Sequence, residues 1–283
     1  MKAYLQLVRA PAALTVLGDT VAGAAAAGNP LRGRRLLLPL SSAAFYWAGM
    51  ALNDWADRKL DAVERPERPI PSGRVSPNQA LAVAGGLTAA GLGLARAAGG
   101  RDTMALAVPL AVAVWAYDTV LKSTVAGPVG MAACRALDVL MGAGATQARR
   151  ALPSAVAVGG HTLGVTALSR GEVHGASRRT AGAVLVGTAV TALTAVSGAS
   201  NWRDRFGALA FSGLYGGLVG RAQFDASQDP SAKKVRTATM AGIHGMVPLQ
   251  AALAARRGSL LGAALVAAAL PVAKRLSRKV SPT

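Results

Sequence analysis

The acidic stretch from Asn53 to Asp61 is the part of the sequence best suited to chemistry. It reads Asn-Asp-Trp-Ala-Asp-Arg-Lys-Leu-Asp and continues an apolar segment without a break. On a continuous helix with about 100° per residue, its four oxygen-bearing side chains share one arc of about 100°. These side chains are Asn53, Asp54, Asp57 and Asp61. Carboxylates this close repel one another at a membrane boundary, so the pattern predicts a bound cation, and Mg²⁺ suits oxygen ligands beside phosphate. The alternative is a solvated helix end with ordinary ion pairs.

A basic loop follows the acidic stretch. Three prolines within residues 64–74 prevent a regular helix there, and the same loop carries Arg65, Arg68 and Arg74. Guanidinium groups bind phosphate oxygens through paired hydrogen bonds. Carboxylates, a divalent cation and arginines together predict a site for a diphosphate group.

The composition places the site in a membrane protein. Of 283 residues, 52% are hydrophobic and only 16% charged, and the mean hydropathy is +0.36. A soluble chain carries about a quarter charged residues, whereas a membrane helix needs about 20 apolar residues. The single Cys134 excludes an internal disulfide. We therefore expect an all-α bundle of about nine transmembrane helices around a central cavity, forming one domain over residues 1–283. The expected spans, of which the last is the weaker, are 11–28, 36–53, 79–98, 103–121, 128–147, 153–168, 180–198, 206–221, 235–254 and 258–273.

The net charge of +18 indicates topology rather than nucleic-acid binding. With the N-terminus inside, the inner loops hold 19 Lys and Arg and the outer loops 11. This bias predicts a cytoplasmic N-terminus, and anionic lipid is the expected membrane partner. Aromatic residues make up 4% of the chain, too few for a base-stacking surface. We expect a protein integral to the cell membrane, the plasma membrane of a bacterium.

The residues around the acidic stretch resemble the UbiA superfamily of intramembrane prenyltransferases, the 4-hydroxybenzoate polyprenyltransferase-like proteins. Asn53 to Asp61 matches the family's NDxxDxxxD motif, and Arg68 to Gly73 matches its basic RPxxSG loop. Tyr117 followed by Lys122 matches a second, weaker family pattern at the end of the fourth span. The span pattern also agrees, so the resemblance extends over nearly the whole chain.

The resemblance implies a Mg²⁺-dependent transfer of a prenyl group from an isoprenoid diphosphate to a small acceptor, through an allylic carbocation. It implies catalytic roles for Asp57, Asp61, Lys122 and Arg65, metal ligation by Asn53, Asp57 and Asp61, and substrate binding by Asn53, Asp54, Arg58, Arg68 and Tyr117. From the residues themselves we expect Asp118, Arg135, Asp138 and Arg170 to bind substrate as well, and Glu172 to supply a further metal ligand.

The sequence departs from the family pattern in the loop after the sixth span. Residues 168–175 hold one carboxylate, Glu172, where the family has a second Asp-rich motif. Whether a second Mg²⁺ binds therefore does not follow from the sequence. Glu172 could supply one ligand to it, or Arg170 could contact the phosphate directly in place of the ion. Asp229 lies in the next inner loop before a proline, where turn formation is the simpler interpretation.

Several polar residues and glycines within the spans call for separate interpretation. Arg135 and Asp138 share a helix face, so they form either an internal ion pair or a polar wall of the acceptor pocket. Repeated Gly-x-x-x-Gly pairs, Gly213 with Gly217 and Gly216 with Gly220, indicate close helix packing.

The sequence is compatible with more than one acceptor and more than one class of reaction. An aromatic acceptor is the family default, and the polar residues of the spans also suit a polyol or cyclitol. The competing functions are a membrane terpene cyclase and a non-catalytic protein that binds or transports prenyl lipid. The prenyl chain length and the oligomeric state do not follow from the sequence.

Overall fold

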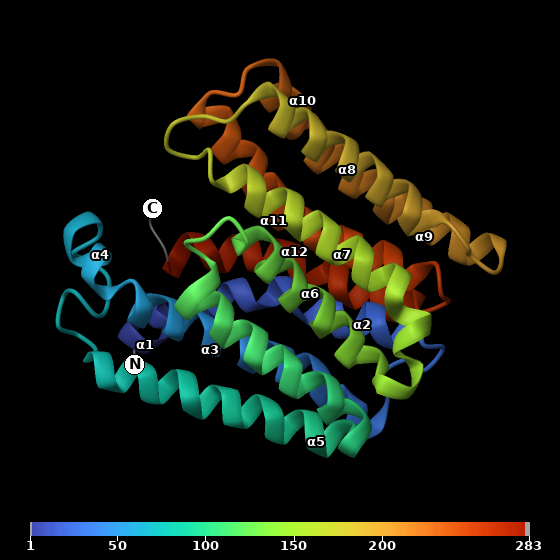
Figure 1. Ribbon diagram of the computed structural model, residues 1–283. Coiled ribbons are helices and arrows are strands. Elements are labelled where there is room, and N and C mark those ends of the chain that lie inside the picture. The colour runs from blue at the N-terminus through green and yellow to red at the C-terminus, as the bar shows by residue number, and fades with distance from the viewer. Residues whose placement is uncertain (1, 281–283) are drawn as a thin grey trace.

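The computed structural model describes residues 2–280, and within this range the chain is built of helices (Figure 1). The α-helices are α1 (Lys2–Leu7), α2 (Leu17–Ala26), α3 (Leu37–Ala56), α4 (Arg58–Glu64), α5 (Pro77–Ala116), α6 (Gly127–Ala143), α7 (Ala148–Ser169), α8 (Arg178–Val196), α9 (Trp202–Tyr215), α10 (Arg221–Gln228), α11 (Ala232–Ala255) and α12 (Leu260–Val280). Short 3-10 turns are η1 (Ala10–Thr15), η2 (Gly33–Leu36) and η4 (Ala145–Gln147), and η3 (Tyr117–Leu121) and η5 (Gly216–Gly220) are π-helical. The expected all-α bundle is confirmed.

Each expected span coincides with a helical segment. By length and hydropathy alone, four helices of the described chain could cross a membrane, namely Gly33–Ala56, Pro77–Leu121, Ala145–Ser169 and Arg178–Val196. The second of these, 45 residues long, contains two expected spans, because Gly100 turns the chain back with φ 61° and ψ −137°. A residue with a Cβ rarely adopts this left-handed φ, so glycine permits the reversal. Figure 1 shows the two arms of α5 side by side.

The long helix α5 begins at a capping box that its sequence provides. The Ser76 hydroxyl accepts from the Gln79 backbone N–H at 3.2 Å, and the Gln79 side chain accepts from the Ser76 N–H at 2.9 Å. Pro77 occupies the first helical position, where its missing N–H costs no hydrogen bond. The basic loop is therefore held against the start of α5 rather than continuing α4.

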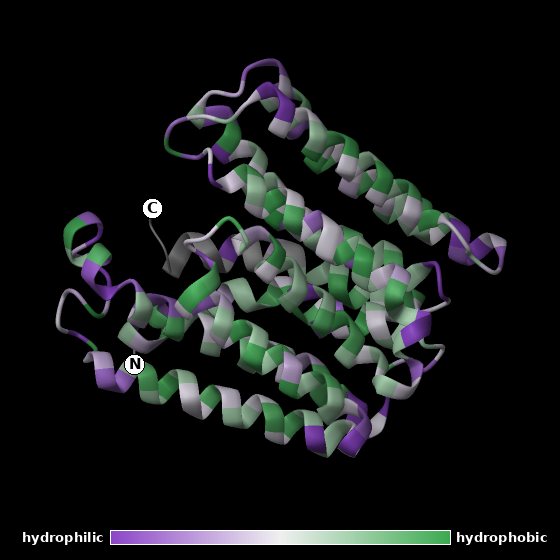
Figure 2. Ribbon diagram, viewed as in Figure 1, coloured by the Kyte–Doolittle hydropathy of each residue, from purple (hydrophilic) through white to green (hydrophobic). Residues whose placement is uncertain are grey.

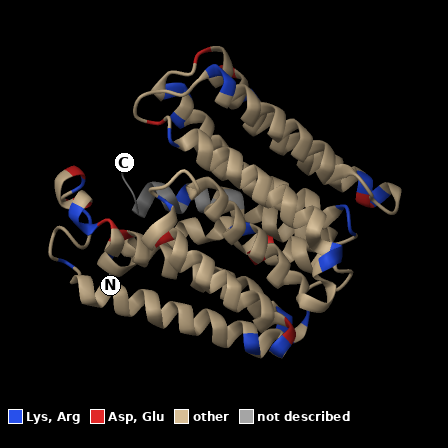
Figure 3. Ribbon diagram, in the orientation of Figure 1, with Lys and Arg blue, Asp and Glu red and all other residues tan. Residues whose placement is uncertain are grey.

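Most charged residues lie at the two ends of the bundle, and the helix middles are mainly apolar (Figures 2 and 3). At one end Arg170 hydrogen-bonds the Thr124 carbonyl and the Ala176 N–H donates to Pro230. At the other end the Thr146 N–H donates to Asp102 at 2.7 Å. Loops that the charge bias assigned to one side of the membrane thus share one end of the fold.

Helices α2 and α6 approach each other through two glycines. A Cβ on Gly23 would collide with the Val139 carbonyl oxygen, and a Cβ on Gly142 would collide with the Thr20 backbone. The Gly-x-x-x-Gly pairs predicted to pack closely do not do so within the described chain, because a Cβ on Gly213, Gly216, Gly217 or Gly220 would meet no atom within 4 Å. The close helix contact made through glycines lies instead between α2 and α6. These two helices carry Asp19 and Arg135, respectively.

Replacing Gly23 by alanine should therefore destabilise the protein. The added methyl group meets backbone atoms that cannot rotate away, so α2 and α6 must separate. Overpacking of this kind costs about 1–3 kcal/mol, which lowers the melting temperature on the order of 5 °C. Thermal unfolding in detergent measures the effect, with Gly213→Ala on the exposed face of α9 as the matched control. Equal melting temperatures for the two variants would contradict the close α2–α6 contact.

Candidate active site

The acidic stretch lies where α3 passes into α4. α3 ends at Ala56, and Asp57 has φ −85° and ψ 1° before α4 begins at Arg58. The prediction of an unbroken helix is wrong, because this ψ departs from helical geometry. Hydrogen bonds of 2.9 Å from the Asp57 N–H to Asn53 and from the Asp61 N–H to Asp57 keep the turn spacing across the bend. The Asp54 and Asp61 side chains are only 4% and 3% exposed, whereas Asp57 is 29% exposed.

Two arginines neutralise the buried carboxylates. Arg68 from the basic loop lies 2.6 Å from Asp61 and 3.4 Å from Asp54. Arg9 approaches Asp54 from the N-terminal segment at 3.0 Å. Arg9 has a left-handed φ of 46°, which turns the chain between α1 and η1. Sequence reasoning assigned Arg9 only to the inner loops, because no local pattern connects it to Asp54, 45 positions away.

Lys122 completes the cluster from a third part of the chain. Its Nζ lies 2.7 Å from Asp57 Oδ1 and 3.5 Å from the Asn53 carbonyl oxygen. The π-helical turn η3 precedes it, closed by a 2.9 Å hydrogen bond from the Lys122 N–H to the Tyr117 carbonyl. Such single π turns often occur at functional sites. In this turn the buried Asp118 accepts a hydrogen bond from the Asn53 side-chain amide at 3.3 Å.

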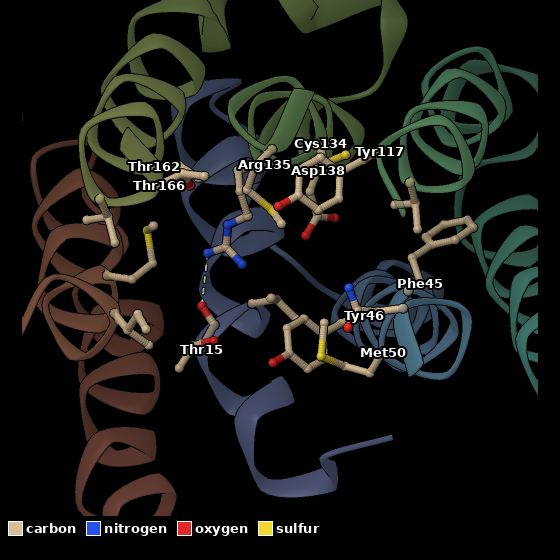
Figure 4. A pocket seen from close by; sticks show the side chains of 18 of the residues that line it. Thr15, Phe45, Tyr46, Met50, Tyr117, Cys134, Arg135, Asp138, Thr162 and Thr166 are labelled. Atoms are coloured by element: carbon tan, nitrogen blue, oxygen red, sulfur yellow. Dashed lines mark hydrogen bonds between the residues drawn. The ribbon is translucent and has the colours of Figure 1, made fainter. Parts of the chain in front are cut away.

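A cavity of about 490 Å³ extends from this cluster into the bundle. η1, α3, α5, η3, α6, α7 and α11 all contribute to its walls. Asn53, Tyr117, Asp118 and Glu172 line it, with Phe45, Leu110, Val114, Met131, Val165, Ile243 and Met246 among its apolar residues. Figure 4 shows side chains from η1, α3 and α6 pointing into this space. An elongated apolar molecule with a charged head fits this combination of groups.

Arg135 and Asp138 both line the cavity but do not pair with each other. Arg135 Nε lies 3.0 Å from Asp19 Oδ2, and Arg135 Nη2 donates to the Thr15 carbonyl oxygen at 3.0 Å. Asp138 instead accepts a hydrogen bond from the Ser42 hydroxyl. The predicted ion pair within α6 is wrong, because Asp19 on α2 is fully buried and takes the guanidinium as its counter-charge.

Three predicted basic residues lie outside the cluster of ion pairs. Arg58 stacks on the Trp55 ring at 4.7 Å and donates to the Trp55 carbonyl at 2.7 Å. Arg65 is exposed, and the exposed Arg170 is bound to Thr124. Direct contact of these residues with a substrate remains a prediction.

The loop that replaces the second acidic motif carries no further acidic cluster in the described chain. Glu172 lines the cavity and is half-buried. Asp229 lies 3.2 Å from Lys234 and accepts from the Ser231 N–H at 3.3 Å. The hydrogen bond from Lys234 holds the pKa of Asp229 below its usual value. Asp229 thus serves the turn before α11, as its position before Pro230 indicated.

The acidic stretch fits Mg²⁺ by the kind of donor it offers. Carboxylate and amide oxygens are the hard ligands that Mg²⁺ takes, usually one or two carboxylates with water and substrate phosphate oxygens completing the shell. Within residues 2–280 no three His, Cys, Asp or Glu side chains come together as a ready-made cage. Asp57 is 29% exposed and pairs with a single, partly exposed lysine, so it suits an ion that arrives with a diphosphate.

The chain is similar to known membrane proteins over most of its length. The profile of the UbiA prenyltransferase family matches residues 14–243. A digeranylgeranylglyceryl phosphate synthase from Methanopyrus kandleri is 42% identical over 125 residues, 44% of this chain and 45% of that protein. The chain therefore spans less than half the length of that relative. A UbiA homologue from Aeropyrum pernix K1 superposes with a TM-score of 0.66 at 15% identity, covering 85% of this chain and 96% of that one. A homologue from Archaeoglobus fulgidus, bound to GPP and Mg²⁺, has a TM-score of 0.59 at 15% identity, covering 84% and 99%.

Proposed function

The chain belongs to the UbiA prenyltransferase family, and from this premise we propose that it transfers a prenyl group from an isoprenoid diphosphate to a hydroxyl-bearing acceptor. The observation that carries the proposal is that a charged cluster and an apolar cavity adjoin in one site. Asp57, Arg68 and Lys122 form a charged cluster, and Asn53, which Lys122 contacts, lines a largely apolar cavity. Charge suits a diphosphate, and the apolar walls suit its isoprenoid tail.

The basic residues bind and stabilise the leaving group. Lys122 is 18% exposed and held only by Asp57 and the Asn53 carbonyl, so it can turn to a diphosphate oxygen. Arg68 is also 18% exposed, and its guanidinium can serve phosphate as well as Asp61. The C–O bond to the diphosphate breaks with its electron pair on the leaving oxygen, and these cations stabilise that charge where it develops.

Asp57 is the residue best placed to hold Mg²⁺, with Asn53 and Asp61 as its predicted partners. The bound ion supplies a Lewis acid that draws charge from the diphosphate. This chain's own contribution is to orient Asn53 and Asp61, the side chains that would hold the ion together with Asp57. Asp118 fixes the Asn53 amide, and Arg68 holds the buried Asp61 in place.

The cavity controls the fate of the allylic carbocation. Apolar residues such as Phe45, Leu110 and Met246 exclude water, which would otherwise capture the cation. The aromatic ring of Tyr117 offers a π face to positive charge near the reacting end. An acceptor oxygen then forms the new C–O bond, and its proton passes to the released diphosphate.

The acceptor class rests on the relatives and on the lining of the cavity. The name of the similar synthase states a product in which glyceryl phosphate carries two geranylgeranyl groups. Polar lining groups such as Thr15, Ser42 and Thr166 are also suited to an acceptor with hydroxyls. We propose that the site end of the bundle faces the cytoplasm, because the loops there hold most of the Lys and Arg.

Product analysis tests the proposal. Purified protein is incubated with geranylgeranyl diphosphate, Mg²⁺ and a panel of glyceryl, polyol and aromatic acceptors, and lipid products are identified by mass spectrometry. We expect one prenyl ether and one inorganic diphosphate per turnover. A cyclic hydrocarbon formed without acceptor would indicate a cyclase. Mg²⁺-dependent binding without release of diphosphate would indicate a lipid-binding or transport protein.

A further inference from the structure

A buried polar network joins α2, α6 and α11 beside the cavity, and the proposed diphosphate chemistry does not use it. Asp19 on α2 is fully buried. It accepts a hydrogen bond of 3.1 Å from Arg135 on α6 and one of 2.7 Å from Gln250 on α11. Arg135 and Gln250 also donate to the Thr15 carbonyl oxygen, at 3.0 Å and 2.9 Å. Asp19 and Thr15 therefore hold the Arg135 guanidinium by one edge.

Asp138 lies against Asp19, so two carboxyl groups meet in the interior. The two side chains are in hydrogen-bond contact, and Asp138 is only 5% exposed. Each has one buried oxygen without a donor, Asp19 Oδ2 and Asp138 Oδ1. Two carboxylates in contact do not both stay ionised, because one shared proton removes their repulsion and supplies the missing hydrogen bond. The pair therefore carries one proton and, together with Arg135, no net charge.

The surroundings of the two carboxyls place this proton on Asp138. Asp19 has Arg135 as its counter-charge at 3.0 Å and Gln250 as a further donor. Asp138 accepts a hydrogen bond from the Ser42 hydroxyl and has no arginine paired with it. Opposite charge and donated hydrogen bonds favour the ionised form of a carboxyl, so Asp19 keeps the negative charge. Asp138 then donates its proton to Asp19 rather than competing with it for the guanidinium.

Arg135 and Tyr46 present free hydrogen-bonding groups to the cavity (Figure 4). Because Nη2 of Arg135 is bonded to Thr15 and Nε lies against Asp19, Nη1 stays free. Neither Nη1 nor the Tyr46 hydroxyl has a partner among the described residues. Tyr46 precedes Asn53 by seven residues on α3, about 10 Å along the helix, so these groups lie deeper than the acidic stretch. Two free donors suit an oxygen atom of a bound acceptor, from a phosphate or from a hydroxyl.

We propose that Asp19 and Asp138 share one proton, carried by Asp138, and that this pair fixes Arg135 so that Arg135 Nη1 and the Tyr46 hydroxyl hold an oxygen of the prenyl acceptor. Asp19 and Asp138 are positioning residues, because they act on the acceptor through Arg135. The inference rests on the proposed function, since it concerns the acceptor end of the same cavity.

Infrared spectroscopy of the full chain in nanodiscs tests for the shared proton. A protonated carboxyl has a C=O stretching band that lies apart from the bands of ionised carboxylates and amides. At neutral pH we expect Asp138→Asn to remove one such band. Glu64→Gln is the control and should remove none, because Glu64 is exposed to solvent. An unchanged band in Asp138→Asn overturns the proposal, and this readout needs neither substrate nor turnover.

Titration with acceptor lipids tests on which carboxyl the proton lies. The probes are geranylgeranylglyceryl phosphate and geranylgeranylglycerol, which differ only in the phosphate. Asparagine resembles a protonated carboxyl in size and still donates, so Asp138→Asn should raise the Kd of the tighter-binding lipid by no more than about threefold. Asp19→Asn removes the counter-charge of Arg135 and should raise that Kd by about tenfold or more. An equal or larger effect of Asp138→Asn overturns the placement of the proton.

Tyr46→Phe tests the acceptor contact without disturbing the buried network, and it decides the matter if Asp19→Asn does not fold. We expect a Kd about tenfold higher. A loss confined to the phosphate lipid identifies a phosphate oxygen as the bound atom, and an equal loss for both lipids identifies a hydroxyl. No loss for either lipid, or no binding of either by the unmodified protein, overturns the acceptor contact. Thr162→Val is the control, because the Thr162 hydroxyl is already bonded to the Val158 carbonyl at 2.8 Å.

A parallel titration with geranylgeranyl diphosphate and Mg²⁺ separates this inference from the proposed function. Tyr46→Phe and Asp19→Asn should bind the diphosphate as the unmodified protein does, because the network lies away from the charged cluster at Asp57. Diphosphate binding weakened as much as lipid binding would indicate general damage to the bundle and overturn the positioning role. Absent diphosphate binding in the unmodified protein counts against the proposed function, whereas the infrared result still decides whether the proton is shared.

Discussion

Asp57→Asn should lower kcat for diphosphate release by about a thousandfold while leaving the fold intact. Asp57 is the accessible carboxylate of the acidic stretch, and its ion-pair partner Lys122 is itself partly exposed. Asparagine keeps the size of the side chain but removes the charge that a divalent ion needs. Because Asp57 is not deeply buried, thermal unfolding should change little. Initial rates at saturating geranylgeranyl diphosphate measure the effect.

Glu64→Gln provides the matched control for Asp57. Glu64 ends α4 at the same end of the bundle and is exposed, so it loses the same charge without touching the cluster. We expect it to retain the rate of the unmodified protein. If both variants lose activity equally, a general electrostatic effect explains the loss. If Asp57→Asn retains full activity, Asp57 holds no catalytic ion.

Arg68→Met should reduce both stability and activity. Asp61 is 3% exposed, and Arg68 at 2.6 Å is its ion-pair partner. Removing the arginine leaves a buried carboxylate uncompensated, which costs about 3 kcal/mol or more. The loss of Arg68 destabilises the Asp54 carboxylate less, because Arg9 remains as its partner at 3.0 Å. We expect a lower melting temperature and a kcat lowered by about a hundredfold, since a leaving-group cation is lost.

The double variant Arg68→Met with Asp61→Asn separates the two roles of Arg68. Neutral asparagine removes the uncompensated charge, so the melting temperature should recover toward that of the unmodified protein. The rate should stay low, because no cation has been restored at the diphosphate and Asp61, a predicted metal ligand, has been neutralised. Recovery of both properties would mean that Arg68 and Asp61 are both purely structural.

The sequence predicts local features of this protein well. Helix positions follow from apolar segments, and Gly100 falls between two expected spans because a reversal needs a left-handed φ. Arg68 reaches Asp61 because both belong to one short segment of chain. The Asp57 bend and the π turn at Tyr117 carry no sequence signal of their own, since one residue out of α-helical geometry leaves the apolar pattern almost unchanged.

Contacts between distant helices are what the sequence could not predict. Arg135 shares a helix face with Asp138, yet its counter-charge is Asp19, 116 residues away. Arg9 likewise meets Asp54 only because the N-terminal segment folds back on α3. The glycines that pack against a neighbouring helix were not predicted from the sequence either. Gly23 and Gly142 have no Gly-x-x-x-Gly spacing to mark them, and the pairs that do have it face no neighbour among the described residues.

In the proposed reaction, the charged cluster at Asp57 ionises an isoprenoid diphosphate with the help of Mg²⁺. The most direct test is the initial rate of inorganic diphosphate release from geranylgeranyl diphosphate by the purified protein with an acceptor. The rate is measured with Mg²⁺, after EDTA, and after Mg²⁺ is restored. We predict loss of release in EDTA and full recovery with Mg²⁺ in the unmodified protein, with neither in Asp57→Asn. Release that persists in EDTA, or that is equal in Asp57→Asn, would contradict the account.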